Sequence, residues 1–154
     1  MVKRETLKNG EVLKALIFRY LENQTEQNAY AVIRCLRDSE VVVPCLIEMS
    51  DRDKAKFESC TAGDEISAED DIKFIPDTLN NGEHNFLPVF SNTEEMGEYG
   101  KDFNSITYHF FAAIDSARQN DKLQGIVVNA FTTPFIVDKN LFDFIVKMPT
   151  NVED

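Results

Sequence analysis

The chain has 154 residues, 43% of them hydrophobic and 28% charged, which is enough for one folded domain with its own core. Its formal net charge of −11 disfavours binding to nucleic acid or to an anionic membrane surface, and it permits a basic protein partner. No apolar run approaches the ~20 residues of a membrane span, and the N-terminus lacks the apolar segment of a signal peptide. We therefore expect a cytoplasmic protein that does not contact membranes.

Two amphipathic helices are predicted in the first 39 residues. The first helix has an apolar stripe at helical spacing, formed by Leu13, Leu16, Ile17, Tyr20 and Leu21. Thr25 is placed to cap the second helix, whose stripe is Ala29, Val32, Ile33 and Leu36. The short connection between them indicates an antiparallel hairpin, and its apolar faces must pack on the rest of the domain.

Residues 40–49 are apolar at both odd and even positions, which is typical of a strand covered on both faces. Pro44 cannot donate a ladder hydrogen bond and therefore predicts an edge or a bulge at that point. Residues 50–71 are polar and charged, and we expect a mobile loop or irregular hairpin there. The acidic cluster Glu69, Asp70 and Asp71 is expected to be a solvated turn, because it lacks the Gly and the distal Glu of a calcium loop.

Two strands are predicted at residues 72–77 and 85–91, joined by a turn that contains Asn80, Asn81 and Gly82. Ser91 and Glu94 have capping-box spacing for a short helix over residues 93–98. On this interpretation the Phe90 ring is buried and Glu95 lies on the solvent side of the helix.

The C-terminal half predicts a short strand and a helix over residues 105–123, buried strands at 125–129 and 135–137, and a last helix capped by Asp138. Residues 149–154 are expected to form a frayed acidic tail. The predicted fold is a single α/β (α+β) domain at residues 40–148, with a mixed sheet of about five strands and the helical hairpin packed against it.

The three cysteines (Cys35, Cys45 and Cys60) are too few and too scattered for a disulfide framework, and we expect them to be reduced. Cys35 and Cys45 are expected to be small buried apolar residues. With no CxxC pair and with His84 and His109 in different segments, we expect no metal and no cofactor.

The segment from Asn129 to Pro134 interrupts two apolar runs and has two interpretations. As a turn, Asn129 hydrogen-bonds the chain two residues on, and Pro134 keeps Thr133 extended. As a recognition loop, Asn129, Thr132 and Thr133 present polar groups beside an exposed Phe131. These four residues are the candidate binding residues.

Enzymatic chemistry is poorly represented in the sequence. It contains no G-x-S-x-G, no phosphate-binding glycine loop and no HExxH, and nothing local brings a cysteine to a histidine. Carboxylate pairs such as Glu94 and Glu95 are too common in an acidic chain to indicate catalysis. We expect a protein that is not an enzyme.

Two segments, "FLPVFSNTEEM" (86–96) and "GIVVNAFTTPFIVDKNLFDFI" (125–145), resemble the N-terminal domain of the SseB family. In that family a "LPVFT"-like strand end enters an acidic capped turn, and a Gly, three apolar residues, Asn and Pro lead to a short strand and a closing helix. The chain departs from this pattern with Ser91 in place of Thr and Ala130 in place of Pro. The resemblance covers roughly residues 40–146 and leaves the helical hairpin outside.

The resemblance implies no catalytic residue and leaves two classes of function. One is an interaction module that binds an unknown, basic protein partner, with the chain itself a monomer or weak homodimer. The alternative, suggested by the family's serine-sensitivity phenotype, is a domain that binds or senses an amino-acid-related small molecule.

Overall fold

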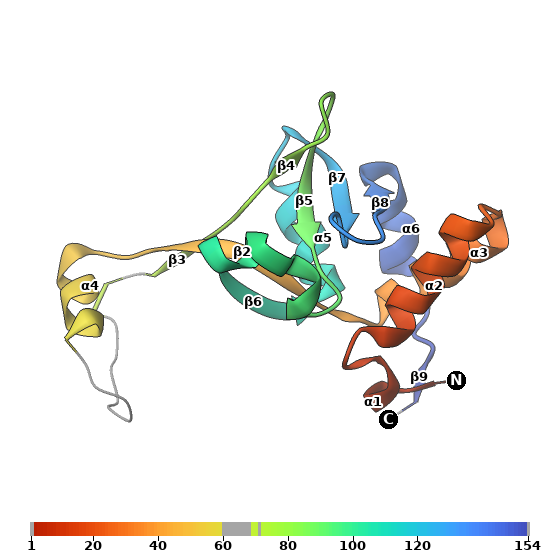
Figure 1. The fold of residues 1–154 in the computed structure, drawn as a ribbon, viewed down its shortest axis with the longest axis horizontal. Helices are drawn as coiled ribbons and strands as arrows, with labels where there is room; N and C mark the ends of the chain where they lie inside the picture. Colours follow the sequence, from red (N-terminus) through yellow and green to blue (C-terminus); the bar gives the residue numbers. More distant parts are fainter. Residues whose placement is uncertain (1, 60–68, 71, 154) are drawn as a thin grey trace.

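The computed structural model describes residues 2–59, 69–70 and 72–153, and its elements are named in Figure 1. The helical elements are α1 (Arg4–Leu7), α2 (Glu11–Glu22), α3 (Glu26–Arg37), α4 (Asp51–Glu58), η1 (Thr93–Asp102), α5 (Phe110–Arg118), η2 (Lys139–Leu141) and α6 (Phe142–Lys147). The strands are β1 (Val2–Lys3), β2 (Glu40–Glu48), β3 (Lys73–Pro76), β4 (Leu79–Asn80), β5 (Asn85–Val89), β6 (Asn104–His109), β7 (Leu123–Val128), β8 (Phe135–Asp138) and β9 (Val152–Glu153). None of the helices within these described ranges is long and apolar enough to cross a membrane.

The predicted helical hairpin is present as α2 and α3. Thr25 caps α3, because its Oγ1 accepts a hydrogen bond from the backbone N–H of Asn28 at 3.1 Å. Ile17 of α2 and Leu36 of α3 are fully buried and share one core with Ile126 of β7. The helical pair therefore packs on the sheets, and the predicted single mixed domain is confirmed.

The strands form three sheets where the sequence predicted one sheet of about five strands. The first has the order β4-β5-β7-β8, with β5 and β7 parallel, and the second is antiparallel with the order β3-β2-β6. β1 and β9 form a short parallel pair. Val42 and Phe90 exchange two backbone hydrogen bonds of 2.8 Å, which join the two larger sheets. Phe90 is fully buried, as predicted.

Pro44 lies in the middle strand of the second sheet, at a gap between partners. On one side, β2 bonds to Phe90 through Val42. The same side of β2 pairs with β3 only from Cys45 onward. Residues two apart on a strand direct their backbone groups to the same side, so the nitrogen of Pro44 faces this gap. Its carbonyl accepts from the Asp77 N–H at 3.1 Å. Pro44 therefore removes no ladder hydrogen bond, but the prediction of an edge or a bulge is wrong, because β2 is the middle strand and its register is regular.

The hairpin in the middle of the chain differs from the prediction. Residues 73–76 form β3 and pair with β2, whereas the short strand β4 pairs with β5. The predicted turn lies between β4 and β5, where the Asn81 side chain accepts from the backbone N–H groups of Glu83 and His84 at 3.0 and 2.8 Å. The chain thus passes from one sheet to the other between β3 and β4.

The prediction of a loop over residues 50–71 is wrong for its first part, which forms α4. Ser50 caps this helix by accepting from the N–H of Asp53 at 3.2 Å. The Asp53 carboxylate is buried and accepts from the backbone N–H groups of Glu69 and Asp70 at 2.7 and 2.9 Å, which lowers its pKa. Arg52 pairs with the Glu69 and Asp70 side chains, each at 2.9 Å. Asp71 and Cys60 lie outside the described residues.

The prediction of a frayed C-terminal tail is also wrong. Residues 152–153 form β9, which pairs in parallel with β1 near the N-terminus, so the two ends of the chain lie together (Figure 1). The buried carboxylate of Asp38 accepts from Thr150 Oγ1 at 2.6 Å and from the Asn151 N–H at 2.8 Å. The pairing of β9 with β1 and the hydrogen bonds to Asp38 thus hold the C-terminal segment in place, although its polar composition had suggested fraying.

The predicted capping box of Ser91 and Glu94 is wrong in both residues, since the cap is Asn92 and the residue three positions on is Glu95. Asn92 caps η1 by accepting from the Glu95 N–H at 3.1 Å, while Ser91 is buried beside β7. The N-terminal end of α2 approaches this turn closely. A Cβ atom built on Gly10 would lie 2.3 Å from the carbonyl oxygen of Ser91, and Gly10 has a φ of +75°.

We predict that Gly10→Ala lowers the free energy of unfolding by more than Gly82→Ala does. Both glycines have positive φ, but a Cβ on Gly82 meets nothing within 4 Å. The backbone conformation should cost about 1 kcal/mol at each position. The overlap with Ser91 should add roughly 1–3 kcal/mol at Gly10 only. Urea denaturation of the two variants measures the difference, and equal losses would contradict the close approach of α2.

Candidate functional site

The predicted recognition loop, residues 129–134, lies at the carboxyl end of β7. β5 and β7 are parallel and lie side by side, so the turn that follows β5 at Ser91 and the loop that follows β7 meet at the same edge of the sheet (Figure 1). The carboxyl edge of parallel strands is where open α/β sheets commonly bind ligands. The four candidate residues are therefore placed together where a site is expected.

Asn129 joins the two strand ends. Its side chain is fully buried, with Oδ1 accepting from the Ser91 N–H at 2.9 Å and Nδ2 donating to Ser91 Oγ at 3.1 Å. Its own N–H donates to the Val89 carbonyl at 2.9 Å, and its φ of +50° turns the chain after β7. A turn is present, since the Thr132 N–H donates to the Asn129 carbonyl at 3.2 Å, but the predicted bond of the Asn129 side chain to the chain two residues on is wrong. The side-chain hydrogen bonds direct the amide of Asn129 inward, to Ser91.

Thr132 connects the loop to a buried carboxylate. Its hydroxyl donates to Glu95 Oε2 at 2.5 Å, and the other carboxylate oxygen of Glu95 lies 2.7 Å from the Lys14 ammonium of α2. Burial favours the neutral acid, but the hydrogen bonds from Lys14 and Thr132 outweigh it and lower the pKa of Glu95. The hydrogen bond and the charge of Glu95 raise the pKa of Lys14. The prediction that Glu95 faces solvent is wrong, since only 6% of the residue is exposed.

Phe131 is the exposed member of an aromatic cluster. It is 53% exposed, and its ring centroid lies 6.0 Å from that of Phe90 and 5.0 Å from that of Tyr99. Tyr99 also contacts Phe103 and donates a hydrogen bond to Asp77. Burial, with the nearby Asp77, keeps the hydroxyl of Tyr99 protonated by raising its pKa. The sequence correctly predicted an exposed Phe131.

Thr133 borders a small hollow on the α2 side of the loop. Its hydroxyl is buried and has no hydrogen-bond partner among the residues that the structure describes. The hollow has a volume of about 300 Å³ and is lined by Thr133 with Glu11, Lys14, Ala15 and Phe18. Of the four candidates, Phe131 and Thr132 are exposed, Thr133 is half-buried and Asn129 is buried. Their binding role stays a prediction.

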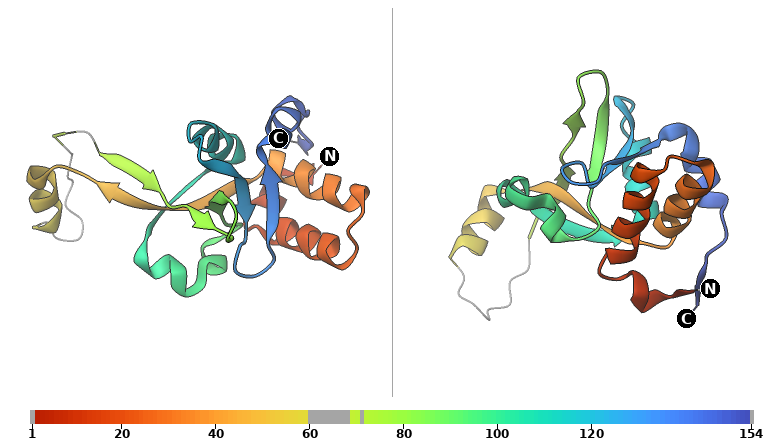
Figure 2. Two further views of the ribbon diagram at one scale, coloured as in Figure 1. Left: turned by 90° about the horizontal axis from the view of Figure 1, so that it is seen from above. Right: turned by 45° about the vertical axis from the view of Figure 1, so that its right-hand side comes forward.

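A second surface was missed by the sequence analysis. β2 and β3 extend from the body of the domain as a two-stranded projection with α4 at its end (Figure 1, and Figure 2, left). Leu46, Ile47, Phe74 and Ile75 lie on this projection and are between 37% and 53% exposed. We call these four residues the apolar ribbon. Residues 40–49 were predicted to be covered on both faces, which is wrong from Leu46 onward.

The apolar ribbon exposes one pair of side chains on each of its faces. Leu46 is paired with Ile75, and Ile47 with Phe74. Successive side chains of a strand point to opposite faces, so one element packed on the ribbon could bury only one of the two pairs. The available signal in the sequence was the polar composition of residues 50–71, which leaves no second apolar element nearby to cover both faces.

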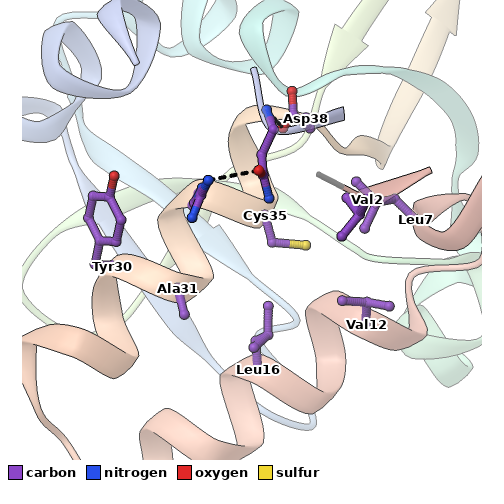
Figure 3. Close-up of a pocket in the computed structure, with 10 residues that line it drawn as sticks. Val2, Leu7, Val12, Leu16, Tyr30, Ala31, Cys35 and Asp38 are labelled. Atoms are coloured by element: carbon purple, nitrogen blue, oxygen red, sulfur yellow. Dashed lines mark hydrogen bonds between the residues drawn. The ribbon is translucent and has the colours of Figure 1, made fainter. Parts of the chain in front are cut away.

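Figure 3 shows a further hollow, of about 250 Å³, between α1, α2 and α3. Leu7, Leu16, Ala31 and Arg34 line it, and Arg34 donates to Asn151 Oδ1 at 2.7 Å. The buried thiol of Cys35 also borders it. Burial raises the pKa of Cys35, so the protonated thiol dominates at neutral pH. Cys45 is unpaired and buried too, as predicted for both residues.

We predict that Glu95→Gln lowers the free energy of unfolding by about 1–2 kcal/mol at neutral pH, because charge-assisted hydrogen bonds to Lys14 and Thr132 are weakened. The pKa of Glu95 is lowered in the folded state, so its contribution is present above the ordinary carboxyl pKa of about 4.3 and is lost as the pH falls through the folded value. The difference in the free energy of unfolding between wild type and Glu95→Gln should therefore become smaller as the pH is lowered.

Urea denaturation over a pH series checks this prediction. Glu94→Gln is the matched control, since Glu94 is the exposed neighbour and its loss should change little at any pH. Equal stability of the two variants at neutral pH would contradict the buried network.

The comparisons with known proteins agree with the resemblance seen in the sequence. The family model described as the SseB protein N-terminal domain matches residues 13–139. No curated protein and no solved structure gives a significant match. The matched range begins at Leu13, near the start of α2, and contains all of α3, so the helical hairpin lies almost wholly within the family's domain and not outside it. With the match covering most of its length, the chain belongs to the SseB family, through its N-terminal domain.

Proposed function

We propose that this chain is a non-enzymatic protein-binding domain and that the apolar ribbon is its contact surface. The observation that carries the proposal is the exposure of Leu46, Ile47, Phe74 and Ile75, one pair on each face of the projection. Exposed apolar side chains that gather on one element, here as one pair on each face, are typical of interaction surfaces. Single exposed apolar residues elsewhere, such as Ile136, are ordinary for a folded protein.

The charge of the chain favours a basic partner. A net charge of −11 opposes the approach of a second copy and attracts a protein with basic residues around an apolar contact. Charges of both signs lie beside the ribbon, including Glu48 and Lys73, which are paired across β2 and β3. The apolar contact would supply affinity, and the overall charge would select the class of partner.

Several polar groups of the kind that performs catalysis have structural roles instead. Glu95 holds Lys14 and Thr132, Asp53 accepts two backbone N–H groups, and Asn129 bonds Ser91. His109 Nδ1 accepts from the Phe111 N–H at 3.1 Å and caps α5. Groups engaged in this way are poorly placed to react with a substrate. This supports a binding role over an enzymatic one.

We predict that Leu46→Asp combined with Phe74→Asp reduces capture of the partner by about tenfold or more, because a charge on each face opposes an apolar contact. Both side chains are more than half exposed, so the domain should remain folded. The measurement is crosslinking and affinity capture with purified tagged protein, with partners identified and quantified by mass spectrometry.

The matched control is Ile136→Asp combined with Phe144→Asp, which changes two comparably exposed apolar residues on β8 and α6. The control should capture the partner as well as wild type does. The proposal would be contradicted if both double variants lost partner capture equally, or if the ribbon variant captured the partner as well as wild type does. It would also be contradicted if wild type enriched no partner.

A further inference from the structure

A groove of about 380 Å³ runs between the base of the apolar ribbon and α5. Its apolar wall is formed by Val43, Leu87, Ile106 and Leu123, which come from strands of both larger sheets. Phe74 of the ribbon lies on the same face of its sheet as Val43 and Ile106, and it continues this wall outward. A cavity of this size, built from fixed strands and one helix, lies within the range of small-molecule sites.

Polar groups meet in this groove from two directions. Tyr108 reaches it from β6, and its hydroxyl is buried without a hydrogen-bond partner among the described residues. Ser116, Gln119 and Asn120 reach it from the end of α5. Burial raises the pKa of Tyr108, with the nearby Ser116 hydroxyl acting against this, so the phenol stays protonated and able to donate. An unpartnered buried hydroxyl is unfavourable, and a bound acceptor would satisfy it.

The groove is suited to an uncharged molecule. The side chains that line it among the described residues are apolar, hydroxyl, phenol or amide groups, with no Asp, Glu, Lys or Arg. A charged ligand would lose its hydration without gaining a counter-charge. The carboxyl end of α5 adds a partial negative charge beside the groove, which further disfavours an anion.

We propose that this groove is a binding site for a small uncharged molecule with an apolar body and one amide or hydroxyl end. The apolar body lies against Val43, Ile106 and Leu123, and the polar end accepts from Tyr108 Oη and meets the hydroxyl and amide groups of α5. This site adjoins the protein contact proposed above, because Phe74 and Ile75 of the ribbon border it. A free amino acid carries two charges and does not suit it.

The test uses four probes that share a branched aliphatic body. Isovaleramide is uncharged, isovalerate is an anion, isoamylamine is a cation, and leucine is a zwitterion. Each probe is titrated into the full isotopically labelled chain while backbone amide shifts are recorded. We expect isovaleramide to shift the amides of Ile106, Tyr108 and residues 116–120, and the three charged probes to bind about tenfold more weakly or worse.

Two variants localise the binding. Tyr108→Phe should weaken isovaleramide about three- to tenfold, because one neutral hydrogen bond is lost, while thermal stability stays unchanged or rises. Thr78→Trp places a large ring at an exposed position of the groove lining and should abolish the shifts. Thr107→Trp is its control, because Thr107 is exposed on the face of β6 opposite to Ile106 and Tyr108.

Equal binding of the charged and uncharged probes, or shifts that lie outside the groove, would overturn the proposal. So would the absence of shifts with isovaleramide up to its solubility limit. Undiminished binding to Tyr108→Phe would overturn the role of the phenol. None of these outcomes bears on partner capture by the ribbon, so the two proposals can fail separately.

Discussion

The hydrogen bonds between the buried Asn129 amide and Ser91 hold the carboxyl ends of β5 and β7 together, and much of the domain is arranged around them. Their distances of 2.9 and 3.1 Å join residues 38 positions apart in the sequence. With Ser91 held in this way, Asn92 is left to cap η1 and Gly10 lies against the Ser91 backbone. One polar pair thus positions η1, the loop after β7 and the start of α2.

The same arrangement gives the conspicuous polar residues of this edge their structural partners. Glu95 lies on η1, so positioning η1 brings its carboxylate between Lys14 of α2 and Thr132 of the loop. A buried carboxylate is tolerated only with such partners, because its desolvation is otherwise unfavourable. The polar groups at the carboxyl edge of the parallel strands therefore connect elements to one another, and the surfaces left for recognition are mainly apolar.

Two of these apolar surfaces share residues. The apolar ribbon is formed where β2 extends beyond the elements that cover its first half, and the groove is formed where its base meets α5. Phe74 contributes its side chain to both, and Ile75 of the ribbon also borders the groove. A molecule in the groove would contact the side chains that we propose meet a protein partner, and by linkage each event would then affect the affinity of the other.

The sequence by itself determined the features that depend on residues close together in the chain. Helical spacing and a capping Thr25 specify α2 and α3, and continuous apolar runs specify the buried strands β5 and β7. The family likewise follows from short local motifs. The turn at Asn129 and the exposure of Phe131 were also within reach, since a polar residue at a strand end and an aromatic residue in a polar loop are local signals.

Tertiary structure alone decided which partners these elements take. Ser91 has the sequence spacing of a helix cap, but in the structure it is hydrogen-bonded to Asn129. The sequence around Glu95 predicts a solvent-facing carboxylate, but Lys14 and Thr132 from other elements bind it. Val152 and Glu153 look frayed until β1 pairs with them. The apolar character of Leu46 and Phe74 favours burial, but the sequence does not show whether another element packs on them. Their exposure, and with it the proposed function, is a consequence of packing between distant segments, which no local pattern encodes.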